Sequence, residues 1–343
     1  MTPKERIFAV IKHQKPDRMP CFGANSTATY DQMERVNAFW PQAHKKAEDM
    51  ARLALAAHSV LGLDAVRVPF CQTFEAEALG CTLMEGGTEG IPGIQHPPTP
   101  YGLDDIPEFP KDFLLRGRIP ELIKAVGLLK HELGDEIPDI GGIIGPLSIA
   151  ASLLDMVPTM KATRKSPEKL KPFLEIGEKA GTTLAIALVE AGADIIVCED
   201  MISSPEMIAP KTYQDYELFY QSRQFQAIPV PKILHICGRI ELIAHLMAQT
   251  GADILSIEPK ADLNLVRDKC GLDIILMGGV GTSDTLFLKD PQTVEKESLK
   301  AMEGGIQILA PGCTISPGSP TENIRKMVET ASNKTRGENK HAE

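Results

Sequence analysis

The chain has 343 residues, of which 43% are hydrophobic and 24% charged, and its formal net charge is −10 at pH 7. This composition is typical of globular proteins, and an acidic chain without a basic run excludes nucleic acid and anionic membranes as expected partners. No apolar stretch reaches the roughly 18 residues of a membrane span, and no signal sequence opens the chain. We therefore expect a cytoplasmic protein that acts on a small molecule or binds another protein.

The N-terminal stretch predicts a short lead-in helix. Thr2 is placed as N-cap, Pro3 as N1 and Glu5 as N3, and an amphipathic segment follows. A first strand is predicted at 19–24 (MPCFGA), and a long helix from 43 to 61 that ends at Gly62.

Apolar runs of about six residues then alternate with helical stretches. The predicted strands are 65–70, 139–146, 193–200, 231–238, 252–259, 272–280 and 306–313, which with 19–24 makes eight. Continuous apolar runs are typical of parallel strands that are buried on both faces. The segments EAGADIIVCED and QTGADILSIEP repeat one strand-and-helix unit. The pattern predicts an α/β TIM (β/α)8 barrel.

The predicted barrel is one domain over residues 1–331. A Gly- and Pro-rich insertion at about 71–138 is expected to cover the barrel mouth. Residues 332–343 are expected to form a polar, frayed tail.

Two side chains able to bind a metal stand two positions apart in KILHICGRI, namely His235 and Cys237. In a strand they point to the same side, and Cys313 in ILAPGCTISPG ends another strand of the same mouth. One imidazole and two thiolates are the ligands of a catalytic zinc. Glu258 ends the strand between them and is the candidate fourth ligand. A His and a Cys on a buried strand are also common core residues, but the third ligand at another strand end favours a metal.

Other residues at the predicted mouth have two interpretations each. Asp200 is either a catalytic or cofactor-binding acid or a cap of the following helix. Gly278 and Gly279, in MGGVGTSDT, either offer backbone N–H groups to an anionic group or form a tight turn. The odd total of seven cysteines argues against a disulfide framework. The cysteines outside the metal set are expected to be structural, namely Cys21, Cys71, Cys81, Cys198 and Cys270.

Several longer motifs extend over nearly the whole chain. They are MTPKERIFAVIKHQKPDRMP, AAHSVLGLDAV, IIGPLSIAASLL, VCEDMISSPEMIAPKTYQDY, LHICG, GGVGTSDTLFLKDPQTVEKE and GCTISPGSPTENIRKMVE. In these motifs the chain resembles the uroporphyrinogen decarboxylase superfamily and, within it, the methylcobamide:coenzyme M methyltransferases of the MtaA/MtbA/CmuA type. The His-x-Cys…Cys set, which separates these zinc methyltransferases from the decarboxylases, is present as His235, Cys237 and Cys313.

The resemblance implies a zinc-dependent transfer of a methyl group, as in methanogenesis. The donor would be a methylated corrinoid on a separate small protein, and the acceptor a thiol, coenzyme M in the archaeal relatives. Zinc converts a bound thiol to the nucleophilic thiolate, and Glu258 would leave the metal when that thiol arrives. Arg67, Arg239 and the Gly278–Gly279 loop are the candidates for holding a sulfonate.

Three alternatives stay open. The first is a uroporphyrinogen decarboxylase. Such an enzyme would need the arginine-rich segment that the decarboxylases carry after their first strand, where this chain has CFGANSTATY. The decarboxylase's Gly-His-Gly is replaced here by Gly312-Cys313-Thr314. A corrinoid methyltransferase with a non-thiol acceptor, such as tetrahydrofolate, is the second alternative. A non-catalytic corrinoid- or thiol-binding protein with a structural zinc is the third.

Overall fold

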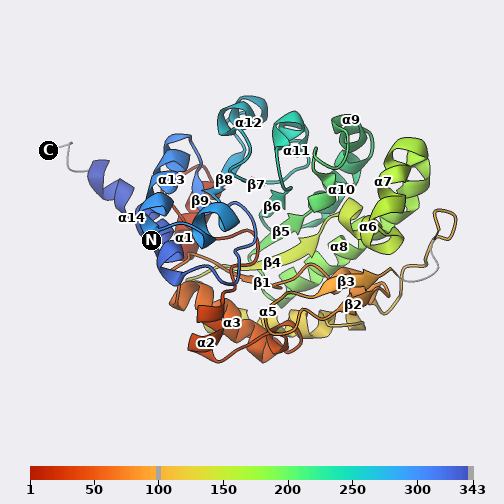
Figure 1. Ribbon diagram of the computed structural model, residues 1–343, viewed down its shortest axis with the longest axis horizontal. Coiled ribbons are helices and arrows are strands. Elements are labelled where there is room, and N and C mark those ends of the chain that lie inside the picture. Colours follow the sequence, from red (N-terminus) through yellow and green to blue (C-terminus); the bar gives the residue numbers. More distant parts are fainter. Residues whose placement is uncertain (98–101, 339–343) are drawn as a thin grey trace.

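A sheet of seven parallel strands forms the centre of the protein. The computed structural model describes residues 1–97 and 102–338. The strand order is β1-β4-β5-β6-β7-β8-β9, and helices surround the sheet (Figure 1). The bounds are β1 Val66–Val68, β4 Asp139–Ile144, β5 Ile195–Glu199, β6 Lys232–His235, β7 Ile254–Ile257, β8 Ile275–Val280 and β9 Ile308–Pro311. Each lies within one of the predicted strands.

The segment predicted as the first strand closes this sheet into a ring. Cys21 forms a parallel bridge with Leu309, and the Leu309 N–H donates to the Pro20 carbonyl over 3.0 Å. On the other side, the Asp64 N–H, two residues before β1, donates to the Cys21 carbonyl over 2.8 Å. The (β/α)8 prediction is thus confirmed, with one of the eight strands reduced to a single bridge. Pro20 has no N–H to extend the ladder, which limits the pairing there.

The first helices precede β1, and the others lie between or after the later strands. They are α1 Pro3–Ile11, α2 Tyr30–Val36, α3 Ala47–Ser59, α4 Phe74–Ala78, α5 Ile119–Leu133, α6 Pro146–Leu154, α7 Met156–Lys165, α8 Lys171–Ala191, α9 Pro210–Thr212, α10 Leu218–Ala227, α11 Ala244–Met247, α12 Leu263–Cys270, α13 Pro291–Glu303 and α14 Thr321–Glu338. The predicted capping box opens α1, since the Thr2 hydroxyl accepts from the Glu5 N–H and the Glu5 carboxylate from the Thr2 N–H. No helix within 1–97 and 102–338 is long and apolar enough to cross a membrane.

The barrel interior has an apolar layer below a polar one. Helix α1 contributes Ile7 and Val10 to the apolar layer. Ala65, just before β1, also belongs to it, and the strands contribute Ile140, Ile195, Val197, Ile233, Ile254, Ile275, Met277, Ile308 and Ala310. Alternate residues of a strand face the same side, so the next inward position lies two residues further toward the carboxyl end of each strand. In several strands that position is a polar residue, and in β4 it is a glycine. We call these positions the polar layer. They are Arg67, Glu199, His235 and Ser256, together with Gly142.

The predicted insertion at 71–138 contains α4, α5 and a hairpin of β2 Thr82–Met84 and β3 Gly93–His96. Ile94 of β3 lines a cleft of about 450 Å³. Ile144 at the end of β4 and Met201 just after β5 line the same cleft. The insertion therefore borders one side of the barrel mouth, although its residues 98–101 lie outside the described ones. Helix α14 extends the chain through Glu338, and the rest of the predicted tail, 339–343, is also outside the described residues.

Candidate metal centre

Three side chains converge at the carboxyl end of the barrel. His235 is the last residue of β6, Cys237 follows it by two residues, and Cys313 lies two residues beyond β9. One ligand atom from each lies within 4.8 Å of the other two, and Cys237 Sγ is 3.4 Å from His235 Nε2. The imidazole is fully buried, whereas both cysteines are partly exposed. The set therefore combines a fully buried imidazole with two partly exposed cysteines.

This spacing fits a tetrahedral zinc ion. Zn–S distances of about 2.3 Å and Zn–N distances of about 2.0 Å put neighbouring ligand atoms about 3.5–3.8 Å apart. The 3.4 Å between Cys237 and His235, and the 4.8 Å limit for the whole set, agree with those separations. Three protein ligands leave a fourth position for a substrate, as in catalytic zinc sites.

A hydrogen bond between the two sulfurs shifts their pKa values in opposite directions. The hydrogen bond from Cys237 lowers the pKa of the Cys313 thiol to about 4, although burial opposes this, and His235 lowers it further. The same hydrogen bond, with burial, raises the pKa of Cys237 far above its usual value. Burial alone would lower the pKa of His235, but the bond to Cys313 and nearby acids raise it overall. The shared hydrogen bond thus favours the thiolate at Cys313 and the thiol at Cys237.

Ser256 on β7 fixes the orientation of the imidazole. Its hydroxyl is 3.0 Å from His235 Nδ1, and both residues are fully buried. The two residues are direct partners in the β6–β7 register. With Nδ1 bonded to Ser256, Nε2 is left to face the sulfurs. Histidine ligands commonly bond a second group in this way, which sets their tautomer.

A buried ion pair lies in the same polar layer. The Arg67 guanidinium donates to Glu199, which is adjacent to His235 in the β5–β6 register and also accepts from Gln72. A Cβ at Gly142 would overlap the guanidinium, so glycine leaves the room that Arg67 occupies. Burial raises the pKa of Glu199, and the charge of Arg67 counters that rise. Arg67 is thus neutralised by Glu199.

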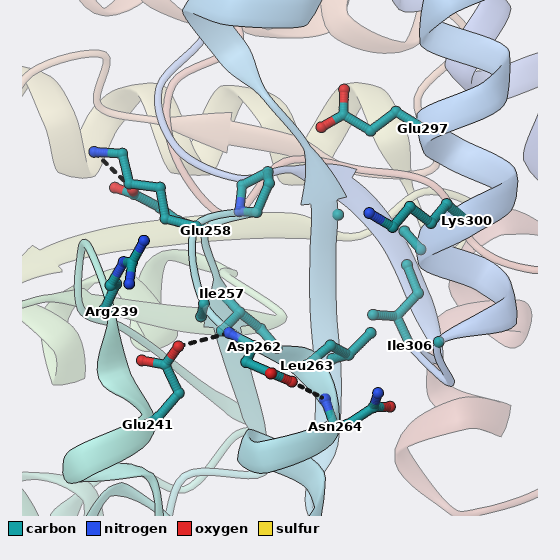
Figure 2. A pocket seen from close by; sticks show the side chains of 16 residues that line it. Arg239, Glu241, Ile257, Glu258, Asp262, Leu263, Asn264, Glu297, Lys300 and Ile306 are labelled. Atoms are coloured by element: carbon teal, nitrogen blue, oxygen red, sulfur yellow. Dashed lines mark hydrogen bonds and ion pairs between the residues drawn. The ribbon is translucent and has the colours of Figure 1, made fainter.

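Glu258 lies beside the three ligands but outside their compact set. It directly follows β7, and its carboxylate is 3.6 Å from Lys260 Nζ (Figure 2). Its charge contributes to the raised pKa values of His235 and Cys237. Its role as a fourth ligand stays a prediction.

The other predicted site residues have packing or capping contacts. Asp200 is fully buried and accepts from the backbone N–H (3.0 Å) and hydroxyl (2.6 Å) of Ser148, in the first turn of α6, and from Gln221 (2.9 Å). It therefore caps α6, and not the helix that follows it, which was the structural alternative considered from the sequence. A Cβ at Gly278 would overlap the Ile257 carbonyl, and one at Gly279 would overlap Ala301. Cofactor-binding roles for these three residues stay predictions.

Sequence reasoning missed Ser256 and the Arg67–Glu199 pair. The available signal was a polar residue inside an otherwise apolar strand segment. These residues are Arg67 in AVRVPF, Glu199 in ADIIVCED and Ser256 in ADILSIEP. Each stands near the carboxyl end of its strand, as the histidine does in PKILHICG.

Comparisons with known proteins agree with this arrangement. The family model for uroporphyrinogen decarboxylase (URO-D) matches residues 2–333. The methylcobamide:CoM methyltransferase MtaA of Methanosarcina barkeri is 36% identical, over 95% of this chain and 96% of its own. MtbA of Methanosarcina mazei is 36% identical over 97% and 98%, respectively. A solved methyltransferase structure from Methanosarcina mazei superposes with a TM-score of 0.93, at 34% identity, and covers 97% of this chain and 99% of that one. The chain therefore belongs to the uroporphyrinogen decarboxylase family and is similar over nearly its full length to the family's methylcobamide:CoM methyltransferases.

Proposed function

We propose that the protein is a zinc-dependent methyltransferase that moves a methyl group from a methylated corrinoid to a small thiol, coenzyme M. The observation that carries the proposal is the set of His235, Cys237 and Cys313, whose ligand atoms lie within 4.8 Å at the barrel mouth. Relatives of 36% identity that bear the name methylcobamide:CoM methyltransferase support it. A small corrinoid protein is the proposed partner, and it must present the methyl group at this mouth.

The charges of the site suit this reaction. Two thiolates and a neutral imidazole balance a dication, so the fourth position can accept one further ligand. Zinc bound there would supply Lewis acidity and hold an incoming thiol as its thiolate. In the overall reaction the thiol sulfur forms a bond to the methyl carbon. The cobalt–carbon bond of the corrinoid breaks with its electron pair left on cobalt, and the thiol proton is released.

The chain's own groups prepare for that reaction. Ser256 orients the imidazole, so that Nε2 and both sulfurs face one point. The hydrogen bond from Cys237 lowers the pKa of the Cys313 thiol, which favours its thiolate form. A porphyrinogen decarboxylase would have to hold several acidic side chains, and the segment Cys21–Tyr30 after the first strand contains no basic residue.

Zinc content and thiol-dependent demethylation of methylcobalamin test the proposal. We expect one zinc per wild-type chain, and Cys237→Ser or Cys313→Ser should lose both zinc and activity. Cys270→Ser is the matched control, because Cys270 is also partly exposed but lies on α12 and bonds the Ala244 carbonyl. Full zinc and activity in the two ligand variants would contradict the proposal. Demethylation that requires tetrahydrofolate and no thiol would instead support the other acceptor.

A further inference from the structure

Cys237 and Cys313 differ from the other cysteines of the chain, although all seven are free thiols. Their sulfur atoms lie within 4.8 Å of each other, and both residues are partly exposed. Cys270 is also partly exposed, but its thiol donates to the Ala244 carbonyl of α11 over 3.2 Å. The remaining four are buried, namely Cys21, Cys71, Cys81 and Cys198. A reagent from solvent therefore reaches the pair at the mouth before it reaches the buried thiols.

The position of the pair in loops lets its sulfurs approach each other. Cys237 lies two residues beyond the end of β6, and Cys313 lies two residues beyond the end of β9, so neither belongs to a strand. Gly238 follows Cys237 with a φ of 84°, and Gly312 precedes Cys313. Glycine leaves the backbone the widest choice of conformations. A disulfide joins its sulfurs at about 2.05 Å, and the movement from the present separation falls on these two loop segments.

We propose that Cys237 and Cys313 are also a site of reversible oxidation, at which a peroxide converts the two thiols to a disulfide and switches the metal centre off. The inference rests on the proposed function, because it concerns the regulation of the zinc site proposed there. One sulfur takes an oxygen atom from the peroxide and becomes a sulfenic acid, with release of one water molecule. The second sulfur then attacks the first, the S–O bond breaks, and the hydroxyl leaves with the second thiol's proton as another water molecule. The two sulfurs together lose two electrons, which reduce the peroxide.

A disulfide at this position is incompatible with the metal. Zinc binds cysteine as the thiolate, and a disulfide sulfur carries no negative charge. Oxidation therefore removes two of the three ligands and leaves only His235. Bound zinc, in turn, holds its sulfur ligands about 3.8 Å apart, so the metal opposes formation of the disulfide. Reduction by a dithiol frees both thiols and restores the site.

Peptide mapping after oxidation tests the inference without an assay of methyl transfer. Zinc-loaded wild type is treated with hydrogen peroxide, alkylated with iodoacetamide and digested without reduction. We expect the peptide that contains Cys237 to be joined to the one that contains Cys313, with a loss of two hydrogen atoms in mass. A chromophoric chelator should detect one zinc released per disulfide, and dithiothreitol with added zinc should restore both thiols and the bound metal. Cys270→Ser is the matched control and should form the same link, whereas Cys237→Ser should form none and should gain oxygen at Cys313.

The outcomes separate this inference from the proposed function. A linked pair, release of zinc, and recovery of thiol-dependent demethylation after reduction support the oxidation site. Zinc release with sulfinic or sulfonic acid at either cysteine, which dithiothreitol does not reverse, overturns it. Full retention of zinc in the linked protein overturns it as well. A wild type that binds no zinc, or that binds zinc and transfers no methyl group to a thiol, overturns the proposed function instead, and peptide mapping still decides whether the disulfide forms.

Discussion

Replacing Ser256 by alanine should weaken zinc binding without a change in any ligand. The hydroxyl, 3.0 Å from His235 Nδ1, belongs to a fully buried pair, so the variant leaves a buried imidazole nitrogen without its partner. Such a group costs about 1–3 kcal/mol. A histidine that binds a metal through one ring nitrogen usually hydrogen-bonds another group through the other. Loss of that group lowers metal affinity about 10- to 100-fold, which corresponds to about 1.4–2.7 kcal/mol. The two estimates agree.

The assay is a zinc titration in competition with a chromophoric chelator, which needs no enzyme turnover. Ser256→Thr keeps a hydroxyl and should retain most of the affinity. Ser298→Ala is the matched control, since Ser298 is equally buried but bonds only the Val294 carbonyl of its own helix over 2.7 Å. If Ser256→Ala binds zinc within twofold of a zinc-binding wild type, the reasoning about His235 is refuted. A wild type that binds no zinc would refute the proposed function instead.

Two further predictions concern stability. Gly142→Ala should lower the free energy of unfolding in urea by about 1–3 kcal/mol, because the new methyl overlaps Arg67. Gly127→Ala on α5 meets no atom within 4 Å and should be neutral or stabilising, so equal losses in both variants would contradict the argument. Burial and the neighbouring Asp200 charge raise the pKa of Glu217 well above 4.5, so its contribution to stability is full below about pH 4.5 and falls as the pH rises through the folded-state value. Glu217→Gln has no carboxyl group to ionise at this position and lacks this loss. The melting temperature of the variant minus that of the wild type should therefore increase from pH 5 to pH 8, and a constant difference would contradict the prediction.

Local signals predicted much of the barrel. Thr2 and Glu5 formed the predicted capping box, and seven of the eight apolar runs became strands. His235 and Cys237 were visible as neighbours because strand geometry places alternate residues on one side. Cys313 could be added only through the barrel hypothesis, which brings strand ends that are distant in sequence to a common mouth.

The remaining contacts depend on which strands are neighbours and in which register. Ser256 reads as a small strand residue until β6 and β7 are aligned, which sets it opposite His235. Arg67 and Glu199 are 132 residues apart, and their pairing needs both the ring and the missing side chain at Gly142. Asp200 caps α6 rather than the next helix because the end of β5 is adjacent to the start of α6 in space.

The place of Cys313 just beyond β9 also makes the metal set a reporter of whether the last strand has joined the sheet. The bridge between Cys21 and Leu309 joins strand positions 288 residues apart, and Cys313 follows that last strand by two residues. His235 and Cys237 come from the fifth strand of the ring, so a chain that has not yet added its eighth strand holds only two ligands. Because a third ligand greatly strengthens zinc binding, tight affinity for zinc would develop only once β9 has paired with β8. Zinc bound at the mouth would in turn stabilise the attachment of β9 to the sheet.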